Sequence, residues 1–466
     1  MADETDTNSH QNHYLSQSAT DGMELPDTST SRRAVLKAAL ATGGTAALSA
    51  CLEAVDDEPI PQGVDDPETL PDRQFAWNDG LDRDEDGNVM LPEHHLFLYL
   101  TYDGETETEA DGAWTPTAAD RRRLEAALQT IERAYERSND GVVFDLGYSP
   151  AYFDRFVSPL PDSVDLPPPR RLTPVDTPTL DQQDALLQLA SDRSDALLAI
   201  EETLFADGDD APTTLNGIEV AGRLSDVFAV DDRRTGFIGP GLPASNQGVG
   251  GIPEDGPVPT EAPLFMGFKV GFEQNQASEA SVAIPEGPFA GGTTKHVARI
   301  RQQLDKWYTE NSHEEMVAKL FSPQMAESGA VEGVGANLGD DNGITEALQE
   351  AIDETAAEFG LVGHAEKAAR GNRDSEGNVR TLRRHVESTD NDNASLHFPS
   401  YQQTISEFEA VQEAMNGTEI VEDEPTIQPR VKNGIFRYIF VENRGNFLIP
   451  PRSLRALPTP QGTDAA

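Results

Sequence analysis

The sequence is poor in cysteine and in basic residues, and both shortages restrict what the protein can be. One cysteine in 466 residues excludes a disulfide framework within the chain. Lys and Arg number 35 against 82 Asp and Glu, which gives a formal net charge of −47. This charge repels nucleic acid and anionic membrane surfaces, so electrostatic binding to either is excluded. Acids in excess, with Arg preferred over Lys, are expected of a protein that works in concentrated salt, where self-repulsion is screened.

The sequence also lacks an apolar run long enough to span a bilayer, which takes about 20 residues. Its apolar run at 38–50 follows the segment SRRAVLK at 31–37, and this order resembles a twin-arginine export signal. Leu48-Ser49-Ala50-Cys51 resembles a lipobox, in which the cysteine is lipidated after cleavage. We therefore predict a signal peptide over 1–50, a lipid anchor at Cys51 on the outer face of the cytoplasmic membrane, and an acidic linker over 51–90. The alternative is a short buried helix with an unrelated cysteine.

The length suggests two or three domains, and the first folded block is predicted over 91–250. Apolar runs predict strands at 95–101, 142–147, 185–190 and 218–230. A helix is expected after Thr117, whose spacing to Asp120 resembles a capping box, and a second helix near 197–204. The resulting order, β-α-β-β-α-β, is typical of a ferredoxin-like domain with helices on one face of an antiparallel sheet.

The second block, predicted over 251–466, repeats this theme after a connection rich in Gly and Pro at 239–262. The predicted strands cover 264–269, 295–301, 380–385, 396–400 and 435–441, and the predicted helices cover 314–321 and 405–415. The acidic stretch 323–360 is interpreted as an insertion. The fold class is therefore α+β, with two ferredoxin-like domains whose sheets pack together and whose helices lie on the outer faces.

An acidic motif between the linker and the first strand is compatible with calcium. Asp82, Asp84 and Asp86 alternate, Gly87 permits a turn, and Glu93 stands twelve positions from the start, as in a calcium loop. Oxygen ligands at this spacing can wrap Ca²⁺. The alternative is an acidic turn that leads into the strand at 95.

The second block contains four stretches, at 267–271, 291–307, His364 and 382–384, which in this order resemble the dye-decolorising peroxidase family, including its deferrochelatase branch. Residues 267–271, GFKVG, resemble the family motif Gly-Phe-x-Asp-Gly. Residues 291–307 resemble a Gly-Gly-Ser-Tyr strand that ends in an Arg-Ile-Arg segment and a Trp. His364 resembles the proximal histidine, and 382–384 resemble the Leu-Arg-Arg strand that follows it. The resemblance extends over most of 90–450.

The resemblance implies that the C-terminal half binds haem b. His364 is then the proximal ligand of the iron, which requires one neutral imidazole nitrogen and an acceptor for the other nitrogen. The alternative is that His364 is an ordinary surface histidine. Other histidines in the same region or in the first block are rivals for this role: His94, His95, His296 and His385.

On the distal side, the family uses an Asp and an Arg to cleave peroxide. Arg383 matches the arginine, which stabilises developing negative charge. Val270 stands at the position of the aspartate and cannot move a proton, so a distal water or Glu273 is left as a substitute. Gly271 and Phe272 follow in the same loop and are expected beside the haem.

Two other sets of residues follow from the same resemblance. Arg299 and Arg301 are candidates to face the haem propionates, with a solvated strand face as the alternative. Arg370 stands where the family has an Asn-Pro-Arg sequence, and is a further candidate for cofactor binding.

Three functional hypotheses follow. The first is an exported, lipid-anchored haem peroxidase that uses hydrogen peroxide and an unknown reductant. The second is a non-enzymatic haem- or iron-binding protein with a degenerate distal site. The third is a cell-surface structural or interaction protein without haem. A homo-oligomer is compatible with all three.

Overall fold

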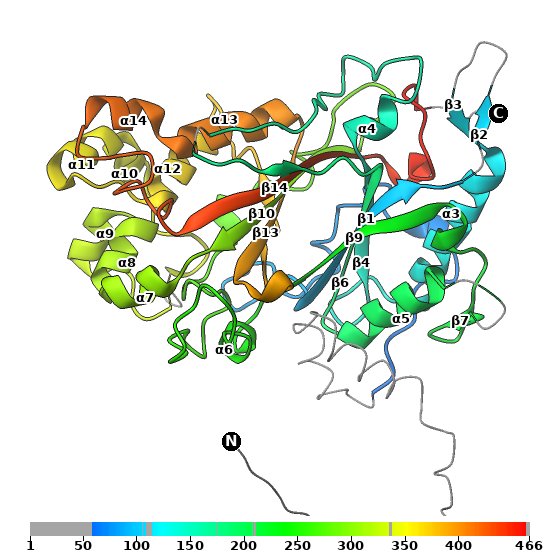
Figure 1. The fold of residues 1–466 in the computed structure, drawn as a ribbon, viewed down its shortest axis with the longest axis horizontal. Coiled ribbons are helices and arrows are strands. Elements are labelled where there is room, and N and C mark those ends of the chain that lie inside the picture. The colour runs from blue at the N-terminus through cyan, green and yellow to red at the C-terminus, as the bar shows by residue number, and fades with distance from the viewer. Residues whose placement is uncertain are drawn as a thin grey trace, which may run out of the picture.

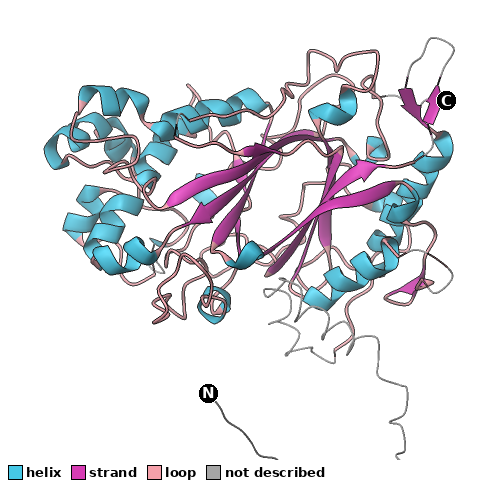
Figure 2. Cartoon of the chain, viewed as in Figure 1, coloured by secondary structure: helices cyan, strands magenta, loops and turns pink. Residues whose placement is uncertain are grey.

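The computed structural model describes residues 58–462, except for 105, 109–113, 174, 207, 209–210 and 335–337. Its centre is a ten-stranded sheet in the order β10-β13-β12-β9-β1-β6-β4-β14-β5, with β11 paired to β13. The additional pairing of β10 with β14 closes the sheet into a barrel, and helices lie outside it (Figures 1 and 2).

The strands and helices have the following bounds. The strands are β1 (His94–Tyr102), β2 (Thr106–Thr108), β3 (Trp114–Pro116), β4 (Val143–Tyr148), β5 (Thr179–Leu180), β6 (Ala185–Ser191), β7 (Thr214–Leu215), β8 (Ile218–Glu219), β9 (Phe228–Phe237), β10 (Thr293–Gln302), β11 (Leu382–Arg383), β12 (Val386–Ser388), β13 (Ser395–Gln402) and β14 (Ile439–Ile449). The α-helices are α3 (Ala118–Ala134), α4 (Pro150–Phe153), α5 (Ser194–Leu204), α6 (Leu242–Ser245), α7 (Asp305–Glu310), α8 (His313–Leu320), α9 (Pro323–Ser328), α10 (Glu346–Glu350), α11 (Ile352–Phe359), α12 (His364–Gly371), α13 (Ile405–Asn416) and α14 (Thr418–Asp423).

The barrel consists of two halves with the same strand order. In the N-terminal half the neighbours are β9-β1-β6-β4, and in the C-terminal half they are β14-β10-β13-β12. Both are the 4-1-3-2 order of a ferredoxin-like sheet. The halves join antiparallel where β12 meets β9 and where β14 meets β4. The predicted fold class of two ferredoxin-like units is confirmed.

Alternation of side chains along the strands separates the barrel interior from the helix-covered face. In β1, Leu96 and Leu98 face the helices, whereas Phe97 and Tyr99 belong to a cluster inside the barrel. The helix after Thr117 forms as predicted, because the Thr117 hydroxyl accepts a hydrogen bond of 3.0 Å from the Asp120 backbone N–H.

Three predicted strands differ from the structure. The last strand of the N-terminal half is β9 (Phe228–Phe237) instead of 218–230, and the final strand is β14 (Ile439–Ile449) instead of 435–441. Residues 264–269 form no strand, because the Gly267 N–H donates to the Leu264 carbonyl in a turn with a φ of +88° at Gly267. This apolar run is buried against helices, which a short run cannot distinguish from a strand.

The described part of the predicted linker does not extend away from the body. Phe75 and Trp77 are fully buried, and the Gln74 side-chain amide donates to the carbonyls of Leu146 and Pro450. Acidic composition predicted a solvated segment, but two large aromatic side chains fix 58–90 against the barrel. The twin-arginine segment and Cys51 lie outside the described residues. Among the helices described, none combines the length and apolar character needed to cross a bilayer.

Candidate functional site

The C-terminal half contains two adjoining apolar cavities on the helix-facing side of its sheet. The first, here called the Phe408 lobe, has a volume of about 940 Å³, and the second, the Val270 lobe, about 1050 Å³, both counted to the open mouth. Six residues line both lobes, at the junction between them: Ile300, His364, Ala368, Arg383, Phe398 and Ile439.

His364 is held at this junction by its local backbone. It is the first residue of α12, and the Glu366 carboxylate accepts from the Gly363 N–H just before the helix. Gly434, with a φ of +60°, passes so close that an added Cβ would lie 3.1 Å from the Cα of His364. Glycine is therefore required at 434 for this approach.

The environment of His364 keeps its imidazole neutral. Burial, with the nearby charges of Lys367 and Arg383, lowers the pKa of His364 to about 3. Its Nδ1 is buried without a hydrogen-bond partner among the described residues. A neutral imidazole that lines an apolar cavity fits the requirement for a haem ligand, although the acceptor expected at its second nitrogen is missing.

Arg383 is fixed in the same cavities by the loop before β10. Its Nη2 donates to the Asn275 carbonyl at 2.8 Å, and the side-chain oxygen of Gln276 accepts from its backbone N–H at 3.0 Å. Burial lowers the pKa of Arg383 to about 10, so the guanidinium remains cationic at neutral pH. The Val270 lobe thus contains a positioned positive charge without a carboxylate bonded to it.

The loop of the predicted distal motif lies where the sequence placed it. Val270, Gly271 and Phe272 line the Val270 lobe together with His364 and Arg383. Phe272 is 3% exposed and narrows the lobe. Glu273 does not replace the missing acid, because its side chain is exposed and pairs with Arg83 at 3.4 Å.

The two arginines predicted to face the propionates, Arg299 and Arg301, line neither lobe. Arg299 lies on the barrel side of β10, where its Nη2 donates to the Asp390 carbonyl, while its neighbours Ala298 and Ile300 face the cavity. Arg301 pairs with Glu442 at 2.9 Å.

Arg370 also lies outside the two lobes. It points to the surface of α12, where it pairs with Asp353 at 3.2 Å. The cavity-facing side of α12 carries His364, Ala368 and Asn372, spaced four residues apart, which excludes position 370 from the same face.

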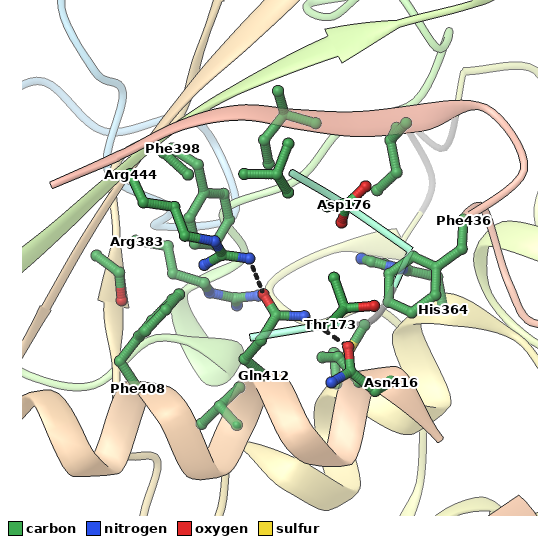
Figure 3. A pocket seen from close by; sticks show the side chains of 18 of the residues that line it. Thr173, Asp176, His364, Arg383, Phe398, Phe408, Gln412, Asn416, Phe436 and Arg444 are labelled. Atoms are coloured by element: carbon green, nitrogen blue, oxygen red, sulfur yellow. Dashed lines mark hydrogen bonds between the residues drawn. The ribbon is translucent and has the colours of Figure 1, made fainter. Parts of the chain in front are cut away.

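Two arginines that the sequence analysis missed, Arg430 and Arg444, line the Phe408 lobe. Figure 3 labels Arg444. Arg430 pairs with Asp176 at 3.3 Å. No described carboxylate forms an ion pair with Arg444, and its Nη2 lies 3.4 Å from the Gln412 side-chain oxygen, a contact that Figure 3 marks. Burial lowers the pKa of Arg444 to about 10. No motif marked these residues, because they come from β14 and the loop before it.

Of the rival histidines, one lines the cavity. His385 stacks on Phe398 at 5.7 Å in the Val270 lobe, and its Nδ1 is buried without a partner. Burial, with the charge of Arg383, lowers the pKa of His385 to about 3. His296 lies outside both lobes, stacked on Phe408 and bonded to Asn446. His94 and His95 are buried on β1 in the other half of the barrel.

The acidic loop has another arrangement than the predicted calcium site. The Asp84 carboxylate accepts from the backbone N–H groups of Asp86 and Asn88 and pairs with Lys269 at 2.6 Å. Over the described residues, which include 82–93, no three His, Cys, Asp or Glu side chains gather as a metal site. Asp82, Asp86 and Glu93 therefore do not converge with Asp84, and the loop is a turn closed by one carboxylate.

Comparison with known proteins places the chain in a family. Residues 92–451 match the model of a family of unknown function, DUF7405. The chain belongs to this family. No curated protein matches it.

Solved structures resemble this DUF7405 member along nearly their whole length. The encapsulated DyP-type peroxidase from Mycobacterium smegmatis is 16% identical, with a TM-score of 0.50 over 87% of this chain and 100% of that one. A DypB variant from Rhodococcus jostii RHA1, in complex with heme, is 16% identical, with a TM-score of 0.51 over 79% and 96%. A DyP-type peroxidase-like protein from Shewanella oneidensis is 12% identical, with a TM-score of 0.50 over 81% and 96%. The fold is that of DyP-type peroxidases.

Proposed function

We propose that the protein is a haem-dependent peroxidase of the dye-decolorising type, with haem in the joined Phe408 and Val270 lobes. The observation that carries this proposal is the convergence of a neutral His364 and a cationic Arg383 on one apolar cavity. The DyP-type fold supports it. Haem, when bound, supplies the redox chemistry of its iron.

Residues of this chain would bind the haem, orient the peroxide and move the proton. His364 would bind the iron through Nε2. Arg444, which forms no ion pair with a carboxylate of the described residues, would hold a haem propionate. Arg383 would orient peroxide and stabilise negative charge as the O–O bond breaks. His385 lines the same lobe as Val270, and its unpartnered Nδ1 would take the proton that the family's aspartate takes.

A second candidate is a haem- or iron-binding protein without turnover. Two observations favour it: Val270 stands in place of the acid, and His364 Nδ1 has no acceptor to increase its basicity. For either candidate, export by the twin-arginine pathway and a lipid anchor at Cys51 remain proposals that rest on the order of motifs at 31–51.

The decisive experiment is an absorption spectrum of the protein produced with haem available in high salt. We expect a Soret band that disappears in His364→Ala, because the iron loses its ligand. His313→Ala is the matched control, since His313 begins α8 outside both lobes, and it should retain the band. A protein that stays colourless and does not bind added haemin would refute the peroxidase and the haem-binding form of the second candidate. A normal band without peroxide consumption would favour the second.

A further inference from the structure

A third cavity shares no lining residue with the two lobes. It has a volume of about 840 Å³ to its open mouth. Three segments build it: 62–74, the end of α3 through the start of β4 at 132–144, and the turn at 452–455. We call it the arginine cavity, after the side chains that line it: Arg73, Arg137, Arg452 and Arg455.

The charge of this cavity is opposite to that of the protein. Four arginines and two glutamates line it, in a chain whose net charge is −47. Arg452 and Arg455 are neutralised by two carboxylates: Glu132 pairs with both, at 2.7 Å and 2.5 Å, and Glu125 pairs with Arg455 at 2.9 Å. The second glutamate, Glu136, is exposed and accepts from the Ser138 hydroxyl. The remaining positive charge is that of Arg73 and Arg137.

Neither of these two guanidinium groups has a partner in the described part of the chain. Nothing there forms a hydrogen bond or an ion pair with the Arg73 side chain or with that of Arg137, and Arg137 Nη2 is buried. Burial lowers the pKa of Arg137, against the attraction of the Glu279 carboxylate farther away. A cation buried without an acceptor costs free energy, whereas a bound anion that accepts its N–H groups offsets that cost. The planar fork of Arg suits carboxylate and phosphate oxygens in particular.

We infer that the arginine cavity binds a small organic anion through a carboxylate or phosphate group, held by Arg73 and Arg137. The apolar side chains of Val142 and Phe144 on the same wall would contact the body of that molecule. The wall at 62–74 belongs to the segment that packs on the barrel through Phe75 and Trp77. This inference does not depend on haem or on the proposed function.

Titration calorimetry of the full chain tests the site directly. Sodium phosphate and sodium succinate are titrated separately at constant ionic strength, with sodium chloride as the balancing salt. We expect saturable binding of at least one of the two, and the tighter ligand identifies the preferred group. Arg73→Gln and Arg137→Gln should each raise the Kd at least tenfold, and Arg137→Lys, which keeps the charge but loses the fork, should raise it less.

The matched control is Arg133→Gln, which removes a positive charge near the end of α3, four residues before Arg137, at a residue that does not line the cavity. Its Kd should equal that of the wild type. Absence of saturable binding, or an equal Kd in Arg73→Gln and the wild type, would overturn the inference. Equal heats for phosphate, succinate and a chloride blank would also overturn the inference. If Arg137→Gln fails to fold, the Kd of Arg73→Gln decides the test, because Arg73 is only half-buried and its loss should not prevent folding.

Discussion

The two halves of the barrel share a strand order, but they use the helix-facing side of the sheet differently. In the N-terminal half, Leu96 and Leu98 of β1 belong to the same buried cluster as Leu128 of α3. In the C-terminal half, the corresponding face of β10 presents Ala298 and Ile300 to the Phe408 lobe. The same topology therefore packs this face of β1 into a buried core in one half and leaves the corresponding face of β10 on an apolar cavity in the other.

The difference originates in what is inserted between the first and second strands of each half. Between β1 and β4 the chain forms one long helix, α3, whose leucines fill the space over the sheet. Between β10 and β11 it forms α7 to α12, and His364 begins the last of them. In Figure 1 these helices form a group at the end of the barrel distant from α3 and α5. The insertion thus supplies both the space and the candidate ligand.

The largest effect is expected for His385→Ala, a substitution in the hollow C-terminal half. Because His385 lines a cavity, its loss should change peroxidase activity more than the free energy of unfolding. If His385 carries the proton, its loss should reduce the rate of peroxide consumption by about 10²–10⁴-fold. The Soret band should be retained, since His364 is untouched. Stopped-flow measurement of peroxide consumption, beside the absorption spectrum, checks both statements.

Val270→Asp in the His385→Ala background is the matched rescue, since it returns a carboxylate to the same lobe. It should restore part of the lost rate. An unchanged rate in His385→Ala would remove the residue from the mechanism, and loss of the Soret band would make it a ligand instead.

The sequence predicted those parts of the site that are encoded in one short segment. Val270, Gly271 and Phe272 belong to one loop, and Arg383 follows His364 in the order of the family motifs, so their convergence was predictable. The positions of residues that depend on the orientation of a strand could not be predicted in this way. Arg299 was assigned to the haem, but alternation on β10 turns it to the barrel side while Ala298 and Ile300 face the cavity.

Contacts between segments that lie far apart in the sequence could not be predicted from the sequence. Arg444 reaches the Phe408 lobe only because β14 closes the barrel against β10. The arginine cavity combines three segments separated by up to several hundred residues, and none of them carries a motif. Composition predicted an acidic linker over 51–90, because acids outnumber Phe75 and Trp77, the two aromatic residues that anchor its described part.

Two substitutions compare the packed face of the N-terminal half with the cavity-lined face of the C-terminal half. Leu128→Ala should lower the free energy of unfolding by about 2–5 kcal/mol, because Leu128 is fully buried and its loss creates a cavity. Val411→Ala, on α13, should cost under about 1.5 kcal/mol, since Val411 already borders the Phe408 lobe. Urea unfolding of both apoproteins in high salt measures the difference. Equal losses would mean that the C-terminal face is as well packed as the other.

The smallest predicted effect concerns Gly434, the backbone position that holds His364. Gly434→Ala places a Cβ 3.1 Å from the His364 Cα and forces an alanine to a φ of +60°, which costs about 1–2 kcal/mol. Gly329→Ala is the matched control, because Gly329 has a φ of +64° and no atom within 4 Å of the added Cβ. Both variants should lose similar stability from backbone strain in urea unfolding. Only Gly434→Ala should also weaken haemin binding in a spectroscopic titration, because only there does the new methyl group displace the ligand. Equal haemin affinity in the two variants would show that the position of His364 does not depend on this contact.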